Sequence, residues 1–171
     1  TTALEDLLHA QLSIEAQSLA LRDDFRRIRE ELQQAAQDEA NASARPGRRG
    51  ASMYAPLNLF ARGRNGSLEI YWQEVHVHGK SRTKRFEYIP RNSKGGYSIP
   101  RLLARARPFE VELVHETERR AQELRILWRE YSAIRRALNR VEVVCRHRIA
   151  ENPVNQRAPA RIELVPTLEP A

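Results

Sequence analysis

The sequence lacks the features that define several large protein classes. It contains one cysteine, Cys145, which excludes an internal disulfide framework and a cluster of thiolate metal ligands. No apolar run approaches the roughly 20 residues that span a membrane, and the opening residues carry acids where a secretory signal carries lysines. Aromatic residues make up only 6% of the chain, so the supply of core residues is moderate. We therefore expect a cytoplasmic protein without a membrane partner.

Catalytic motifs are absent as well. The sequence has no glycine-rich phosphate loop, no nucleophile with a base in a known motif, and no paired carboxylates in its central segment. His76 and His78 would face the same way on a strand, but no carboxylate or cysteine there clearly completes a metal site. The sequence therefore predicts a non-catalytic protein without a metal or cofactor. Cys145, near a helix end, is expected to be a small buried thiol.

The charge of the chain is unevenly distributed. There are 29 basic and 22 acidic residues, a net charge of +7. Residues 44–107 hold fourteen Lys and Arg against three Glu, a charge of +11, whereas residues 1–43 hold four Arg against nine acids, a charge of −5. Residues 108–150 (+2) and 151–171 (−1) are nearly balanced. A positive charge concentrated in one segment indicates a polyanionic partner.

Residues 1–43 are expected to form one long helix. No Gly or Pro interrupts this stretch, and Ala, Glu, Gln and Arg fill the positions between two heptad seams. One seam is Leu4, Gln11, Ser18, Phe25 and Leu32, and the other is Leu7, Ile14, Leu21, Ile28 and Ala35. A narrow apolar seam of this kind usually pairs with another helix.

Residues 108–150 supply a second long helix. Pro108 suits its first turn, and the glutamates that follow are favourable near the positive end of the helix dipole. Its seams are Leu113, Arg120, Leu127, Ile134 and Val141, and Thr117, Leu124, Tyr131, Leu138 and Cys145. Antiparallel pairing of the two helices within one chain is the preferred geometry, and pairing between two chains of a homodimer is the alternative.

Residues 57–107 are predicted to form a basic β-meander with a short helical turn. Residues 68–78 are rich in strand formers, 84–89 return as a second strand, and 57–60 form a third. The fold class is therefore α+β: two long helices pair as an antiparallel coiled-coil-like hairpin, with a small antiparallel β-meander inserted between them. A basic flexible linker at 44–56 and a proline-containing flexible tail at 151–171 complete the expected organisation.

The hydrophobic alternation of the central strand carries two further predictions. It shifts phase between Trp72 and Val75, which suggests a bulge at the two residues between them. The same alternation places Trp72 and Tyr88 in the core. Tyr71 and Tyr97 are left as candidates for stacking on unpaired bases, although packing is the commoner role of such residues.

Basic residues of the central segment are the candidate binding residues. Phosphates attract them because each neutralised charge releases condensed counterions, and a two-stranded ribbon has the width to enter a major groove. The predicted nucleic-acid-binding residues are Arg48, Arg49, Arg62, Arg64, Lys80, Arg82, Lys84, Arg85, Arg91 and Lys94. Arginine outnumbers lysine among them, which favours bidentate contacts with phosphate or guanine. The alternative is a solvated basic surface that binds any polyanion weakly.

Several sequence blocks together resemble a known family. They are GSLEIYW from Gly66, a basic hairpin, Ile89-Pro90, a Gly-Gly-Tyr turn, and PFEVELVHETE from Pro108, which opens an Arg-rich helix. Over roughly residues 66–140 the chain is similar to the MobI-type accessory proteins of conjugative elements. The resemblance implies a relaxosome component that acts at the origin of transfer, alongside a relaxase, to mobilise a plasmid or integrative element.

These observations lead to one main hypothesis and two alternatives. The main hypothesis is a non-catalytic accessory protein of conjugative transfer that binds double-stranded DNA at the origin of transfer, with a relaxase or other relaxosome proteins as partners. The first alternative is a coiled-coil adaptor between proteins of the transfer machinery. The second is an RNA-binding module.

Overall fold

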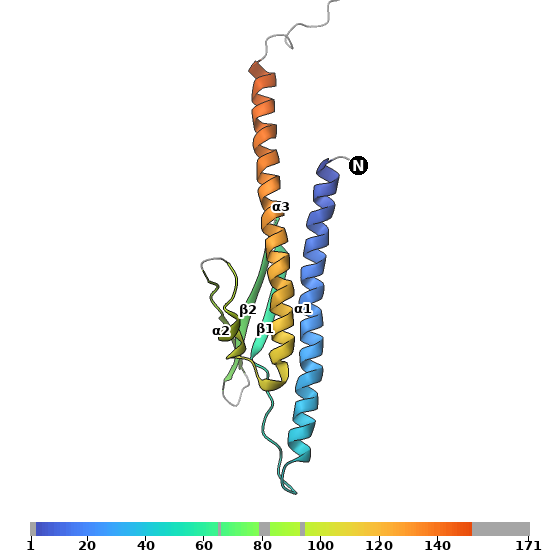
Figure 1. Ribbon diagram of the computed structural model, residues 1–171, viewed down its shortest axis with the longest axis vertical. Coiled ribbons are helices and arrows are strands. Elements are labelled where there is room, and N and C mark those ends of the chain that lie inside the picture. Colours follow the sequence, from blue (N-terminus) through green and yellow to red (C-terminus); the bar gives the residue numbers. More distant parts are fainter. Residues whose placement is uncertain (1–2, 65, 79–82, 93–94, 152–171) are drawn as a thin grey trace, which may run out of the picture. The chain divides into compact units, whose positions relative to one another are not determined.

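The computed structural model describes residues 3–64, 66–78, 83–92 and 95–151 (Figure 1). Its elements in chain order are α1 (Ala3–Ala42), β1 (Leu57–Arg64), β2 (Ser67–His78), β3 (Thr83–Tyr88), α2 (Ile99–Leu103), the 3-10 turn η1 (Pro108–Glu110) and α3 (Val111–Glu151). The chain divides into two compact units, residues 1–131 and 132–171. The first unit contains α1, the sheet, α2, η1 and the N-terminal part of α3.

Helix α1 forms because its sequence contains good helix formers and no Gly or Pro. Side-chain pairs one turn apart support it, such as Arg27 with Glu31 at 3.0 Å. Ile14 and Phe25 are buried on one side. Ser18 is buried between them, and its hydroxyl donates to the Ile14 carbonyl at 2.7 Å, so this polar position of the predicted seam is satisfied within the helix.

Within the first unit, α3 runs antiparallel to α1 (Figure 1). The chain enters α3 through η1, where the Glu110 carboxylate accepts a hydrogen bond from the Arg107 backbone N–H at 3.0 Å. Val114 and Leu124 of α3 share one apolar core with α1, and the Tyr131 hydroxyl donates to Gln11 Oε1 at 2.6 Å. The predicted α+β class is confirmed: two long helices contact each other, with a three-stranded antiparallel sheet between them in the sequence.

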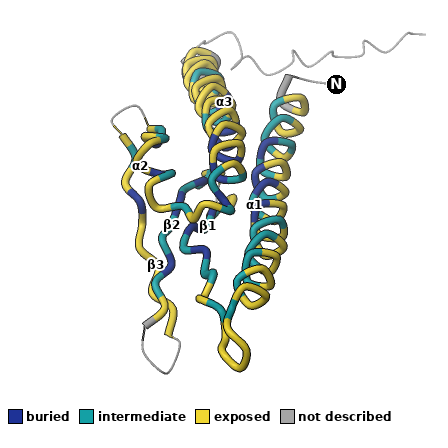
Figure 2. Tube along the Cα trace, turned by 60° about the horizontal axis from the view of Figure 1, so that its bottom comes forward, coloured by how far each residue is buried: buried dark blue, intermediate teal, exposed yellow. Residues whose placement is uncertain are grey.

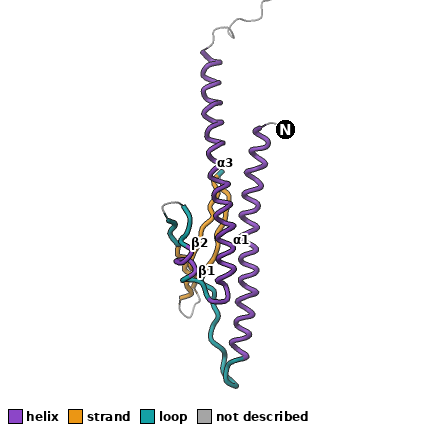
Figure 3. Tube along the Cα trace, viewed as in Figure 1, coloured by secondary structure: helices purple, strands orange, loops and turns teal. Residues whose placement is uncertain are grey.

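The sheet has the order β1-β2-β3 and is antiparallel throughout. Figure 3 shows its strands, in orange, beside the helices. Strand β1 continues to Arg64, four residues beyond the predicted end at Phe60. The predicted bulge is wrong, because β2 keeps an uninterrupted register with both neighbours. The phase shift has another cause: Val75 points to the face opposite Trp72 and is buried there beside Tyr54, whose hydroxyl donates to the Val75 carbonyl at 3.0 Å.

One face of the sheet, the inner face, packs against the helices. Leu59, Ile70 and Trp72 are buried there in the same core as α1 and α3. Helix α1 also covers the free edge of β1, since the guanidinium groups of Arg22 and Arg29 donate to β1 carbonyls at 3.0 and 2.6 Å. The core therefore fixes one face and one edge of the sheet, and the opposite face is partly exposed to solvent.

Strand β3 is exposed along its whole length (Figure 2). Tyr88, predicted to be a core residue, is 50% exposed. The prediction failed because the register pairs Tyr88 with Gln73, and residues opposite each other in a sheet share a face. Trp72 is on the inner face and Gln73 is on the other, so Tyr88 points away from the helices.

The second unit contributes the C-terminal part of α3. Every side chain described from Val141 to Arg148 is exposed. Cys145, predicted to be buried, is exposed with them. The second seam of α3 is buried at Leu124 and Tyr131, and the core described in the first unit ends there. None of the helices in the described part of the chain has the length and apolar character that a transmembrane segment needs.

Candidate nucleic-acid interface

The face of the sheet opposite the helices, the outer face, carries cations at both ends and aromatic rings between them. The alternation of the strands and the two registers define its members. They are Asn58, Phe60, Arg62 and Arg64 on β1, Ser67, Glu69, Tyr71, Gln73, Val75 and Val77 on β2, and Lys84, Phe86 and Tyr88 on β3. Three predicted nucleic-acid-binding residues, Arg62, Arg64 and Lys84, therefore lie on one surface. Tyr71, the candidate for base stacking, lies on the same surface.

Arg62 and Arg64 mark the end of this face near the β1–β2 turn. Arg62 is 48% exposed, and its Nε lies 2.8 Å from Glu69 Oε2 on the neighbouring strand. Its guanidinium also lies over the Phe60 ring, 5.5 Å from the ring centre. Glu69 offsets part of the charge of Arg62, and Arg64 adds a second exposed cation beside it.

Lys84 and Arg85 lie at the other end of the sheet, on opposite faces. Lys84 pairs with Val77 on the outer face, whereas Arg85 pairs with His76 on the inner side. Lys80 and Arg82, predicted at the same hairpin tip, lie outside the described residues, as does Lys94. From Glu69 to Val77, β2 extends about 26 Å at about 3.3 Å per residue. The register therefore places the described basic residues of the ribbon at two separate ends.

A polar ladder on α1 holds the segment that carries Arg48 and Arg49. Both arginines are exposed just after the helix. Asn41 Oδ1 accepts from the Gly50 backbone N–H at 3.1 Å, and Gln37 both accepts from the Met53 N–H at 3.0 Å and donates to the Ala51 carbonyl at 3.1 Å. Gln33 Oε1 accepts from the Ala55 N–H at 3.2 Å. These side chains, four residues apart on one helix face, keep both arginines near the end of α1.

Replacing Gly50 by alanine is expected to destabilise the protein by about 1–3 kcal/mol. A Cβ at this position would lie 2.4 Å from the backbone carbonyl of Ala40 and 2.6 Å from the Asn41 backbone nitrogen, which the helix cannot move. Urea denaturation followed by circular dichroism measures the loss. Gly63→Ala is the matched control, since the three atoms nearest to its Cβ all belong to the flexible side chain of Glu15, from 2.9 Å, and that side chain can rotate away. Equal stability of the two variants would contradict the close approach at Gly50.

Sequence reasoning missed two arginines near the hairpin. Arg105 and Arg107 line a groove of about 860 Å³ together with Lys84. Arg105 Nε lies 3.1 Å from Glu74 Oε2, and Arg107 Nε donates to the Tyr54 carbonyl at 3.2 Å. Some twenty residues separate them from Lys84 in the sequence. Their alternate spacing at the end of the basic segment could nevertheless have marked them as candidate binding residues.

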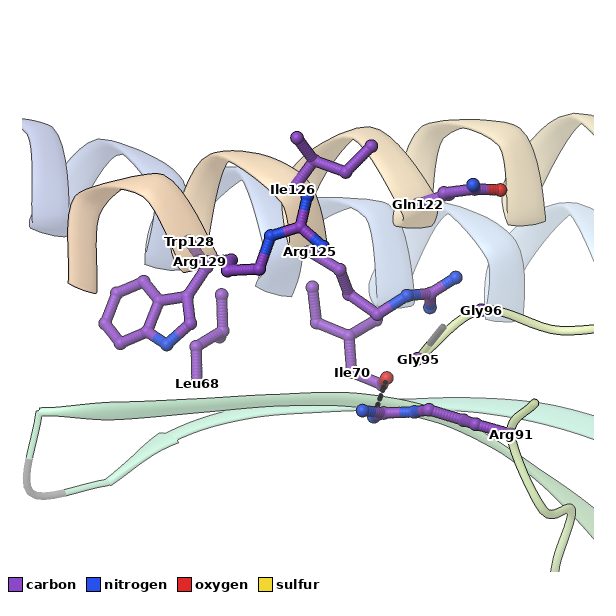
Figure 4. A pocket seen from close by; sticks show the side chains of 10 residues that line it. All are labelled: Leu68, Ile70, Arg91, Gly95, Gly96, Gln122, Arg125, Ile126, Trp128 and Arg129. Atoms are coloured by element: carbon purple, nitrogen blue, oxygen red, sulfur yellow. Dashed lines mark hydrogen bonds between the residues drawn. The ribbon is translucent and has the colours of Figure 1, made fainter. Parts of the chain in front are cut away.

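Arg91 has a structural role at the inner side of the sheet. It lines a cavity of about 410 Å³ between β2 and α3, where Figure 4 shows it below Arg125. Arg91 Nη2 donates to the Ile70 carbonyl at 2.5 Å, which fixes the segment after β3 along the edge of β2. Arg91, one of the basic residues that line this cavity, therefore already makes a hydrogen bond within the protein.

A buried carboxylate lies beside that cavity. Glu118 is fully buried, accepts from Trp72 Nε1 at 2.8 Å and forms an ion pair with Arg125. Burial raises the pKa of Glu118, while Arg125 and the Trp72 hydrogen bond oppose that rise. Tyr97, considered for base stacking, is buried here: its hydroxyl accepts from the Trp72 backbone N–H at 3.0 Å, and the Arg125 guanidinium lies over its ring. Tyr97 therefore belongs to the core.

His76 lies between two carboxylates, with its Nε2 3.5 Å from Glu87 Oε2 and 4.0 Å from Glu74 Oε1. In the described ranges, no three His, Cys, Asp or Glu side chains are grouped so that they could hold a metal ion. This arrangement at the inner side of β2 and β3 is a charge network with Arg105, which pairs with Glu74.

The comparisons with known proteins agree with the sequence resemblance and extend it. The family model described as MobI protein matches residues 14–139. This range begins far upstream of residue 66, so it includes most of α1, which the resemblance did not cover. No curated protein and no solved structure matches the chain. Because the family model covers well over half of its residues, the chain belongs to the MobI family and is a mobilisation-associated protein.

Proposed function

We propose that the protein is a non-catalytic DNA-binding accessory protein of conjugative transfer, which acts at the origin of transfer together with the relaxase. The observation that carries the proposal is the outer face of the sheet, where Arg62 and Arg64 are exposed at one end and Lys84 is exposed at the other. Membership of the MobI family supplies the mobilisation context.

The charge of the segment that carries this surface supports binding to a phosphate backbone. The segment from residue 44 to 107 has a net charge of +11, and its only acids are Glu69, Glu74 and Glu87. Two of the three already have basic partners, Arg62 and Arg105. The exposed positive charge that remains for phosphates comes from Arg64 and Lys84, and from Arg48 and Arg49 in the segment that α1 holds. Release of counterions is the driving force for their binding to phosphates.

Removing these charges is expected to weaken the salt dependence of DNA binding. In Arg62→Ala/Arg64→Ala, and separately in Lys84→Ala/Arg85→Ala, the slope of log affinity against log salt should flatten by about 0.9 for each phosphate that the variant no longer neutralises. Fluorescence anisotropy measures both, with a labelled duplex that carries the transfer origin and a random duplex of equal length. Sequence-independent weakening is expected, since phosphate contacts carry no base information.

The matched control removes the same number of charges elsewhere. Arg27 and Arg119 are exposed helix residues in ion pairs, so Arg27→Ala/Arg119→Ala changes the net charge equally without touching the sheet. This control should leave the slope of the wild type nearly unchanged. If it flattens the slope as much as the sheet variants, the protein attracts DNA only through its total charge, and if no sheet variant alters the slope, the outer face is not the contact surface.

One observation favours a second candidate function, an adaptor between proteins of the transfer machinery. Ile134 and Val141 are one heptad apart in the part of α3 that belongs to the second unit, and both are more than half exposed. Apolar residues at this spacing usually pair with a helix. Retention of the relaxase in a pull-down by a protein that binds no duplex at low salt would select the adaptor over the DNA-binding protein.

A further inference from the structure

Aromatic side chains cross the outer face of the sheet in a row. Phe60 and Tyr71 are paired across β1 and β2, with ring centres 4.6 Å apart and planes inclined by 28°. Tyr71 and Tyr88 continue the row to β3, with ring centres 5.4 Å apart. Phe86 is next to Tyr88 on the same face of β3 and is 54% exposed. We call Phe60, Tyr71, Tyr88 and Phe86 the aromatic row.

The row adjoins a hollow that has both apolar and basic walls. This hollow, of about 420 Å³, is lined by Phe86, Lys84 and Val75 from the sheet and by Arg26, Arg29 and the acidic Glu30 from α1, among others. Asn58 and Tyr54 add polar groups to its wall. An aromatic ring beside cations and an amide is the combination that accepts a flat base on a phosphodiester chain.

Cross-strand packing accounts for only part of this row. Aromatic pairs stabilise neighbouring strands, and the contacts of Tyr71 with Phe60 and Tyr88 serve that purpose. These contacts do not explain why Phe86 and Tyr88 leave half or more of their surface exposed to solvent. Exposed rings between cations leave ring faces open to a ligand that has both flat apolar groups and negative charge.

We propose that the aromatic row is a binding site for single-stranded DNA, whose unpaired bases stack on the rings of Tyr71, Tyr88 and Phe86. Phosphates on either side meet Arg62 and Arg64 at one end of the face and Lys84 at the other. This inference rests on the proposed DNA-binding function and specifies the form of DNA that the face recognises. In duplex DNA the faces of the bases are stacked on each other and are not accessible. A duplex therefore contacts the cations of the outer face but not the aromatic row.

The charge of the outer face favours single-stranded DNA over an apolar protein surface as its ligand. Three of its four charged residues, Arg62, Arg64 and Lys84, are cations, and they stand on both sides of the rings along the strands. An apolar protein partner would have to desolvate these charges without supplying anions, whereas every nucleotide supplies one phosphate.

Anisotropy of a short labelled oligothymidine, measured with the full chain at low salt, tests the proposal. Tyr71→Ala and Tyr88→Ala should each weaken binding roughly 5- to 150-fold, the effect expected for one stacked base. Tyr71→Phe and Tyr88→Phe keep the ring and should bind nearly as the wild type does. Val77→Ala removes an exposed aliphatic side chain from the same face and serves as the matched control.

A duplex of matched length separates this inference from the proposed function. The alanine variants should bind the duplex with unchanged affinity, because the rings do not touch paired bases. If the wild type binds the duplex but not the oligothymidine, or if removal of the rings leaves oligothymidine binding unchanged, the aromatic row is not the site, although the proposed DNA-binding function stands. Binding to neither overturns both, and tighter binding of single-stranded RNA than of DNA overturns the choice of ligand.

The remaining alternative is a contact between proteins. Light scattering of the wild type and of Tyr88→Ala, each without DNA, tests it. The mass of both should be the same. If the alanine variant dissociates a larger assembly, the aromatic row is an interface between protein chains, and the proposal is wrong.

Discussion

Replacing Trp72 by alanine is expected to cost about 3–5 kcal/mol of unfolding free energy, a large fraction of the roughly 5–15 kcal/mol that stabilises a typical domain. The side chain is fully buried at the centre of the inner face, where its ring meets Phe25 edge to face with ring centres 5.0 Å apart. The change leaves a large cavity between α1, the sheet and α3, and it removes a hydrogen bond from Glu118. Thermal unfolding by circular dichroism measures the loss.

Two further variants keep this prediction testable if Trp72→Ala does not fold. Trp72→Phe keeps most of the apolar volume but lacks the indole N–H, so its loss of about 1–3 kcal/mol reports the hydrogen bond with the buried Glu118. Trp128→Ala removes a tryptophan that is only partly buried, in contact with Tyr131, and should cost less than Trp72→Ala. If the two alanine variants lose the same stability, Trp72 is not the centre of the core.

Replacing Arg125 by methionine is expected to cost about 3–5 kcal/mol at neutral pH, because it leaves the buried Glu118 carboxylate without its cation. Burial already raises the pKa of Glu118 above its usual value of 4.5, and the loss of Arg125 raises it further. A carboxyl whose pKa is raised in the folded protein stabilises the fold below its unfolded pKa, and this stabilisation is lost as pH rises through the folded pKa. The variant should therefore regain stability as the pH falls from neutral to mildly acidic.

Urea denaturation at neutral and at mildly acidic pH measures this effect. The double variant Arg125→Met/Glu118→Gln is the control. It has no buried charge at this pair, and its amide oxygen can still accept from Trp72 Nε1, so most of the stability should return. Its stability should also lose the pH dependence of the single variant. A single variant with the same deficit at both pH values would contradict a buried charged Glu118.

Much of the fold could be predicted from local patterns. Absence of Gly and Pro together with heptad seams predicted α1 and α3, and the buried Ile14, Leu21 and Leu124 follow those seams. Strand formers predicted β2. Within the sheet, the errors occurred where a residue looks apolar but faces away from the helices: Tyr88 and Val75 lie on the outer face, and the phase shift between Trp72 and Val75 was read as a bulge.

The candidate site could be predicted only in part. The excess of basic residues between 44 and 107 indicated the right segment, but spacing along the chain does not give distance in space. Antiparallel pairing placed Arg62 and Lys84 at opposite ends of the outer face, and folding of the segment after α2 brought Arg105 to the groove of Lys84. Phe60 and Phe86 were not among the candidates for base stacking, because isolated aromatic residues in strands are common.

The sequence by itself determined the element types, the segment that carries the positive charge and the resemblance to the MobI family. These depend on composition and on local periodicity, which act over a few residues. Only the tertiary structure decided which face of the sheet the helices cover, and therefore which side chains solvent can reach. That choice depends on strand register and on packing of α1 and α3 against Trp72, since a shift of one residue would turn the aromatic row of the outer face into the core.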